Sequence, residues 1–285
     1  MMIARKVIFA LTILPILLIS GYSNSSNISD DYRWKRSLIG LEDNWKYAEF
    51  SVIHEGFAVL YTPVNNKNEI TVAINAGHGT NGGEKKKTQC HPDGSPKITG
   101  GTTSQGAVEA IAVSTGMVFS DGTREAEATL EVAHYVKDIL LEQGYNVLML
   151  RDSEDVQLDN VARIVISNNT ADCMISFHWD GDNLNYDKGV FFIKVPEGLK
   201  EMDPVSSLWE KHDELGSAIV ESLEAEGFKK YNSGSLAIDL TQTSYSEIPS
   251  VDIELGNQCS LHDTETLKNM AKAVASGIAL FCANK

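Results

Sequence analysis

Apolar and polar positions alternate along the chain in a way that predicts strands separated by helices. Several short segments are continuously apolar, such as Val72-Ala73-Ile74, and such runs are typical of strands buried on both faces of a mostly parallel sheet. Strands are predicted at residues 56–62, 70–76, 146–150, 172–178, 189–195, 235–240 and 251–255. Helical apolar spacing is found at residues 125–143, 159–169, 204–225 and 264–281. This order predicts an α/β fold with an open, twisted, mostly parallel sheet and helices on both faces.

The first residues have a different character from this folded pattern. A short apolar run at residues 7–20 follows Arg5 and Lys6 and precedes small polar residues, which predicts a secretory signal peptide over residues 1–25. The run is shorter than the roughly 20 residues of a membrane span, and Pro15 interrupts it, so we expect no stable membrane association after cleavage. An uncleaved anchor is the alternative. We therefore expect the protein to be secreted or associated with the cell envelope.

The remaining chain divides into a short polar segment and one long domain. Residues 26–48 are polar and predict a linker or an N-terminal arm, whereas residues 49–285 form the predicted domain. Within it, residues 79–124 are rich in Gly, Thr and Ser and show no clear period. A loop this long in a compact domain is usually functional or disordered. Because candidate site residues lie on both sides of it, we expect a flap over the site, with a disordered insertion as the alternative.

Charge and cysteine content exclude some classes of partner and scaffold. The formal net charge is −15, and nucleic-acid binding normally needs a basic face, so we expect no nucleic-acid partner. The four cysteines are too few for a disulfide-built scaffold. Cys173 and Cys282 lie in apolar patterns and are predicted core thiols, whereas Cys90 and Cys259 are either free or paired with each other. The Cys90-His91 pair is weak evidence for a metal site because no second ligand pair lies nearby.

Three ionisable residues stand at or near the carboxyl ends of predicted strands. His78 follows the second predicted strand, His178 ends the fourth, and Glu254 lies in the last. Ligands of open α/β sheets bind in the crevice beyond the carboxyl ends of the strands. We therefore expect the three side chains to meet at one edge of the sheet. The alternative, a histidine that only caps its strand, becomes weaker when three such residues occupy equivalent places.

Two neutral imidazoles and a carboxylate are a known catalytic zinc set that leaves a fourth position open. Glu254 could be the third ligand, but then no general base would be left. The helix predicted from residue 125 offers Glu125 and Glu127 instead. At about 100° per residue, Glu125 lies about 20° from Val136 on the apolar, sheet-facing side, whereas Glu127 lies about 180° from it and faces solvent. This selects Glu125 as the ligand, on condition that the helix includes it.

These residues stand in motifs that resemble the zinc-dependent N-acetylmuramoyl-L-alanine amidases of the type-3 class, which are bacterial and phage peptidoglycan hydrolases. The resemblance covers roughly residues 70 to 283. Each motif is weak alone, and their order and spacing together make the resemblance specific. The matching segments are Gly77-His78-Gly79, Glu125 at the start of a long helix, Leu150-Arg151-Asp152, Arg163 to Asn168, Ile175-Ser176-Phe177-His178 and Pro249 to Gly256.

The resemblance implies a reaction and a role for each site residue. It implies that His78, Glu125 and His178 bind one zinc ion per chain and that Glu254 is the catalytic base and acid. The implied reaction is hydrolysis of the amide bond between N-acetylmuramic acid and L-alanine, with peptidoglycan and muropeptides as partners. The domain at 49–285 would then be the zinc amidase catalytic domain.

This sequence departs from the family pattern beside both histidines. Asn75-Ala76 stands where the family usually has Asp-Pro, and Trp179-Asp180 stands where it usually has Ala-Asn. The second departure concerns substrate contacts rather than the metal, and Trp179 is either a substrate contact or a core residue. Two alternative functions stay open: a zinc peptidase or amidohydrolase acting on another amide, and a non-catalytic wall-binding protein. The full ligand set together with Glu254 argues against the second.

Overall fold

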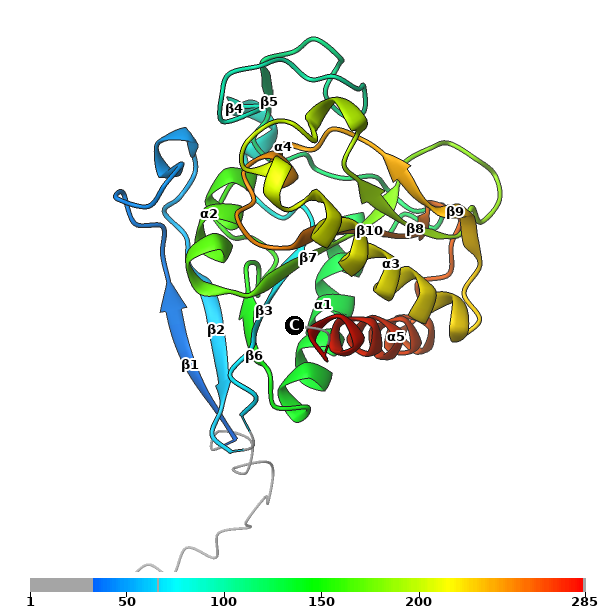
Figure 1. Ribbon diagram of the computed structural model, residues 1–285. Coiled ribbons are helices and arrows are strands. Elements are labelled where there is room, and N and C mark those ends of the chain that lie inside the picture. The colour runs from blue at the N-terminus through cyan, green and yellow to red at the C-terminus, as the bar shows by residue number, and fades with distance from the viewer. Residues whose placement is uncertain (1–32, 66, 284–285) are drawn as a thin grey trace, which may run out of the picture.

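The computed structural model describes residues 33–65 and 67–283, which form one large sheet with helices packed against both of its faces (Figure 1). The predicted signal peptide lies outside the described residues. The sheet has the strand order β1-β2-β6-β3-β7-β10-β8-β9. Its strands are β1 (Trp34–Ile39), β2 (Ala58–Pro63), β3 (Thr71–Ala76), β6 (Asn146–Met149), β7 (Cys173–Asp180), β8 (Val190–Lys194), β9 (Lys230–Ala237) and β10 (Ser250–Asn257).

The centre of the sheet is parallel and its flanks are partly antiparallel. Strand β3 pairs in parallel with both β6 and β7, and β7 pairs in parallel with β10. Strands β8 and β9 are also parallel to each other, whereas the β1–β2, β2–β6 and β8–β10 pairs are antiparallel. The mostly parallel sheet predicted from the continuous apolar runs is therefore confirmed, and these runs are the buried central strands.

Helices cover both faces of this sheet, as the sequence pattern predicted. Helices α1, α3 and α5 pack on one face and on each other, and α2 and α4 lie on the other face (Figure 1). The apolar residues of α1 pack against those of β3, and Gly144 ends the helix in a left-handed conformation with φ of 91°. The helices are α1 (Glu125–Glu142), α2 (Asn160–Thr170), α3 (Trp209–Ala225), α4 (Thr241–Ser244) and α5 (Thr264–Ala283). Within the described residues, no helix has the length and apolarity that a bilayer span requires.

The polar segment at residues 26–48 contains a strand that the sequence analysis missed. Of the two alternatives, a linker or an N-terminal arm, residues 34–39 are not a free linker, because they form β1 and pair with β2 at the edge of the main sheet. The four inner residues of β1 are exposed, because an edge strand is covered by neighbours on one side only. The usual alternation of apolar and polar residues is therefore missing from its sequence.

The segment at residues 79–124 is ordered, which removes the alternative of a disordered insertion. It contains the antiparallel strand pair β4 (Lys87–Gln89) and β5 (Glu109–Ile111). Its buried His91 and Lys97 each lie 2.9 Å from Oδ1 of Asp239, a residue that follows β9. These buried, paired charges tie the segment to the far end of the sheet. The Cys90-His91 pair is thus part of a structural network, because His91 faces Asp239 rather than a metal site.

None of the four cysteines, all of which lie in the described part of the chain, forms a disulfide. Cys173 and Cys282 are buried among core side chains, as predicted. Cys90 is buried and Cys259 is partly exposed, and neither forms the disulfide that the sequence left open.

A buried histidine connects α3 to β10 and makes the stability of the fold depend on pH. His212 is 1% exposed, and its Nδ1 accepts a hydrogen bond of 2.8 Å from the backbone N–H of Ser250. Its Nε2 has no hydrogen-bond partner among the described residues. Burial lowers the pKa of His212 from 6.5 to about 4. The ring is therefore neutral in the folded protein at pH 5 to 6, where the unfolded chain takes up a proton.

We expect acid to weaken the fold through this residue. Because the folded pKa lies below the unfolded value, the contribution of His212 is complete above pH 6.5 and is lost as the pH falls toward 4. The full loss is about 3 kcal/mol, since each pKa unit corresponds to about 1.4 kcal/mol. Urea unfolding at pH 7.5 and pH 4.5 measures it, with His212→Asn as the control that keeps an acceptor but does not titrate. Equal pH dependence of the native protein and the variant would contradict this expectation.

Candidate metal centre

Three side chains from separate elements meet at the carboxyl edge of the central strands. His78 follows β3, His178 lies in β7, and Glu125 is the first residue of α1. Strands β3 and β7 are neighbouring parallel strands, with Ala76 opposite Phe177, so their ends bring the two histidines together. Helix α1 does include Glu125, and this residue is 2% exposed whereas Glu127 is exposed. The helical phase argued from the sequence is therefore confirmed: Glu125 faces inward and Glu127 faces outward.

The three donor atoms face one another at short distances. Nε2 of His78 lies 2.7 Å from Oε1 of Glu125 and 3.1 Å from Nδ1 of His178. Nδ1 of His178 also lies 3.1 Å from Oε1 of Glu125. Within the described part of the chain, these residues are the group of histidine, cysteine and carboxylate side chains whose donor atoms could share a metal ion. The convergence predicted from the sequence is therefore present, and the role of the three residues as ligands stays a prediction.

The contact made by Nδ1 of His78 indicates which nitrogen of this ring carries the proton. Nδ1 lies 2.9 Å from the carbonyl oxygen of Ser114. A carbonyl can only accept, so Nδ1 carries the proton and donates it, and the lone pair on Nε2 points toward Glu125 and His178. Metal-bound histidines are typically held by such a second contact.

The end of the 79–124 segment also fixes Glu125. The backbone N–H of Met117 donates to Oε2 of Glu125 at 2.7 Å, and the N–H of Trp179 donates to Oε1 at 3.0 Å. Gly116 lies against His78 and Glu125 with φ of 81°, and a Cβ there would be 2.7 Å from Cδ2 of His78 and 2.8 Å from Oε2 of Glu125. Only glycine fits this close approach, so residues 114–117 form one wall of the site.

Two buried arginines hold the turn that carries His78. Nη2 of Arg163 donates to the carbonyl of His78 at 2.7 Å, and Nη1 donates to Oδ1 of Asn75 at 2.9 Å. Arg151 donates to the carbonyls of Ala76 and Gly77 at 3.0 Å each. His78 has φ of 67°, which is costly for a residue with a Cβ. The guanidinium contacts stabilise this strained turn at the ligand.

The charges around the site favour a bound cation. Burial alone would raise the pKa of Glu125, but the adjacent His78 and His178 more than offset this effect and lower it. For His178, burial lowers the pKa, but Glu125, Asp252 and Glu254 raise it overall to about 9. Three carboxylates therefore surround one imidazole in a buried place. A positive ion bound here would stabilise the ionised forms of these carboxyl groups.

Glu254 lies next to this cluster, and one of its carboxyl oxygens is buried without a partner. It stands opposite His178 in the pairing of β10 with β7, and its side chain is partly exposed. Its Oε2 has no hydrogen-bond partner among the described residues. Burial, together with the carboxylates of Glu125, Asp180 and Asp252, raises its pKa well above the usual range. A carboxylate with a raised pKa and a free oxygen is suited to accept and return a proton near neutral pH.

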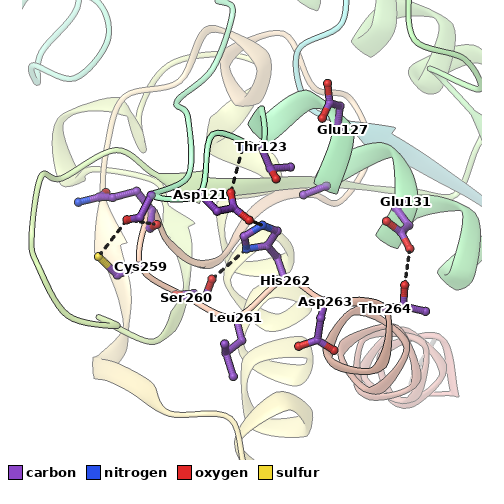
Figure 2. Close-up of a pocket in the computed structure, with 13 residues that line it drawn as sticks. Asp121, Thr123, Glu127, Glu131, Cys259, Ser260, Leu261, His262, Asp263 and Thr264 are labelled. Carbon is purple, nitrogen blue, oxygen red and sulfur yellow. Dashed lines mark hydrogen bonds and ion pairs between the residues drawn. The ribbon is translucent and has the colours of Figure 1, made fainter.

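Two surface cavities flank the amino-terminal half of α1 beside the site. One has a volume of about 750 Å³, and Figure 2 shows His262 in it, paired with Asp121 at 3.2 Å. The other has a volume of about 730 Å³ and is lined by Gly79, Ser114 and Ala126, which adjoin the ligand residues. Both cavities share Glu127 and Glu131 of α1.

Some residues at the site were not identified from the sequence. Asp252 lies two residues before Glu254 and therefore on the same face of β10, and an acidic residue within an apolar strand was a signal that could have revealed it. The contacts of Ser114 and Met117 come from a segment without periodicity, where the sequence carries no such signal. Trp179 is 2% exposed and packs edge-on against Phe119 at 5.6 Å, so it is a core residue and not a substrate contact.

Comparison with known proteins identifies what the chain is similar to. A family model described as N-acetylmuramoyl-L-alanine amidase matches residues 72–283. The amidase Ami1 of Mycobacterium smegmatis is 18% identical with a TM-score of 0.64, and the match covers 78% of this chain and 100% of that one. Ami1 of Mycobacterium abscessus is 21% identical with a TM-score of 0.62, covering 75% and 99% of the two chains. An amidase of Clostridium difficile 630 is 15% identical with a TM-score of 0.56, covering 78% and 100%. A comparison with curated proteins gave no match.

Proposed function

The chain belongs to the N-acetylmuramoyl-L-alanine amidase family, and from this membership we propose that His78, Glu125 and His178 hold one zinc ion while Glu254 moves the proton. As a family member it hydrolyses the amide bond between N-acetylmuramic acid and L-alanine in peptidoglycan. The observation that carries the proposal is the convergence of three donor atoms beside a carboxylate with a free oxygen. The alternative of a non-catalytic wall-binding protein does not account for Glu254.

The donor set suits zinc better than the other common divalent ions. Two imidazole nitrogens and one carboxylate are typical of catalytic zinc sites, whereas magnesium and calcium prefer oxygen ligands. The Nδ1–H of His78 is already held by Ser114, and both oxygens of Glu125 are held by backbone N–H groups. When bound, zinc supplies Lewis acidity to the scissile carbonyl and to the attacking water. The protein residues thus preorganise the ligands before the ion binds.

Glu254 has the role of proton carrier in this scheme. Its carboxylate takes a proton from the attacking water and then delivers it to the nitrogen of the leaving L-alanine. Both transfers use one carboxylate, so the group must be a base in the first step and an acid in the second. The raised pKa of Glu254 makes its carboxylate a stronger base for the first transfer than an ordinary glutamate.

We also propose that the enzyme works outside the cytoplasmic membrane. Its substrate, peptidoglycan, is a component of the cell envelope, and the first 25 residues have the pattern of a secretory signal. Both points support a secreted or envelope-associated enzyme. Separation of secreted, wall and membrane fractions, with detection of the tagged full-length chain, tests this assignment.

Analysis of the reaction products tests the proposed function. Digestion of purified muropeptides is expected to release peptides with a new L-alanine amino terminus and intact glycan chains, and the protein is expected to contain one zinc ion per chain. Mass spectrometry identifies the products, and metal analysis of the purified protein gives the zinc content. Cleavage within the stem peptide would instead favour a zinc peptidase, and product formation without any bound metal would contradict the metal centre.

A further inference from the structure

The second nitrogen of the His178 ring has a different environment from that of His78. Nδ1 of His178 faces the other two ligands, so Nε2 points away from them. The charged group beside Nε2 is the carboxylate of Asp252, whose Oδ2 lies 3.9 Å from it. This distance is longer than a hydrogen bond but within the range of an ion-pair contact.

Asp252 is buried, and one of its two carboxyl oxygens has no partner among the described residues. It is 7% exposed and lies in β10, opposite Ser176 of β7 and Ile193 of β8. Its Oδ1 has no hydrogen-bond partner among the described residues. Its side chain hydrogen-bonds with Ser176. Burying an acidic group that leaves one oxygen unpartnered is still costly, so Asp252 requires a physical reason for its place.

A polar layer on this face of the sheet leads from the His78 turn to Asp252. Asn75 accepts from Arg163 through its Oδ1 and donates through Nδ2 to the Ser176 hydroxyl at 3.2 Å. Gln242 donates to the same hydroxyl at 2.6 Å. Two donors thus hold the oxygen of Ser176, the residue opposite Asp252 in the strand pairing. Ser176 in turn hydrogen-bonds with the side chain of Asp252, and these contacts hold the Asp252 carboxyl group beside the His178 ring.

The position of the proton on His178 decides whether this ring can bind a metal ion. The Oε1 atom of Glu125 is 3.1 Å from Nδ1 and favours a proton there, and such a proton would block the lone pair that faces the site. A negative charge beside Nε2 favours the opposite tautomer, in which Nε2 carries the proton and Nδ1 is free to bind. Asp252 is on the correct side of the ring to have this effect.

We propose that Asp252 is a positioning residue that keeps the proton on Nε2 of His178 and so presents Nδ1 to the metal. The inference rests on the proposed function, because it requires that His178 is a zinc ligand. Asp252 touches neither the substrate nor the reacting atoms in this scheme. Its removal should therefore weaken the metal site rather than substrate binding.

Zinc affinity of the full-length protein and of two variants tests this inference. Competition with a chromophoric chelator is expected to show zinc binding weakened about 10-fold in Asp252→Asn and about 10- to 100-fold in Asp252→Ala, the range typical for residues that orient a ligand. At saturating zinc, KM for muropeptides should change less than twofold. The neutral Asn side chain keeps the size of Asp, so this variant decides the outcome if the Ala variant does not fold.

Ser250→Ala is the matched control, because Ser250 is 1% exposed and lies on the same face of the same strand with an unpartnered hydroxyl. Ser250→Ala should leave zinc affinity unchanged. If it does not, the loss in the Asp252 variants includes a general effect of loosening β10, and this control measures the size of that effect. Zinc affinities of both Asp252 variants within twofold of the native value would overturn the inference. A native protein that binds no zinc, or a His178→Ala variant that binds it normally, would instead refute the proposed metal centre.

Discussion

Replacement of Glu254 with Gln is expected to slow amide hydrolysis by about 10²- to 10⁴-fold, the usual contribution of a positioned proton-transfer group. The amide has the size of the carboxylate but cannot accept the proton of the attacking water. Glu254 is not one of the three converging donor residues, so the variant should still contain one zinc ion per chain. Initial rates on purified muropeptides, together with metal analysis and a thermal unfolding curve, measure the three expectations.

The matched control for this variant is His178→Ala, which removes a proposed ligand instead of the proposed base. It should lose zinc and activity together, whereas Glu254→Gln should separate the two properties. Because Oε2 of Glu254 has no partner among the described residues, its replacement breaks no hydrogen bond at that atom, and the fold should keep its stability. Activity of Glu254→Gln close to the native rate would remove this residue from the mechanism.

The parts of the fold that the sequence predicted are those where burial imposes a pattern. Central strands such as β3 and β7 are apolar on both sides, and α1 has an apolar stripe that also determines the direction of Glu125. His78 and His178 were each predicted at the carboxyl end of a strand, and because neighbouring parallel strands end at the same edge of the sheet, the two residues were expected to meet there. These predictions needed only local pattern and the geometry of a parallel sheet.

The features that were missed depend on contacts between distant segments. Strand β1 has exposed inner residues and is defined by its pairing with β2. The carbonyl of Ser114 meets the ring of His78 across 36 positions of the chain, and no local pattern encodes that distance. Arg163 was identified only as part of a motif, because a sequence does not show that its partners are backbone carbonyls. Position-specific contacts of this kind require the folded structure.

Replacement of Arg163 with Met is expected to lower the free energy of unfolding by about 4 kcal/mol, because several buried acceptors lose their donor and each costs about 1–3 kcal/mol. Arg163 is fully buried and donates to the carbonyls of Leu158, Ala76 and His78 and to the side chain of Asn75. Burial lowers the pKa of Arg163 to about 9, which still leaves the guanidinium charged at neutral pH. Relief of that buried charge offsets only part of the loss.

The same replacement should also weaken zinc binding, and this second effect links the core to the site. His78 is held at φ of 67° by its surroundings, and Arg163 contacts its carbonyl directly, so the turn should relax toward an ordinary conformation without it. Urea unfolding and chelator competition measure the two effects, with Arg36→Met as the control, since Arg36 is 59% exposed and its contact with Asp152 is worth about 1 kcal/mol at most.

Arg163→Lys keeps the charge but offers fewer donors, so its stability should fall between those of the native protein and Arg163→Met. A loss below about 1 kcal/mol in Arg163→Met would show that the turn is held by its other contacts, and the assignment of Arg163 as its main support would be wrong.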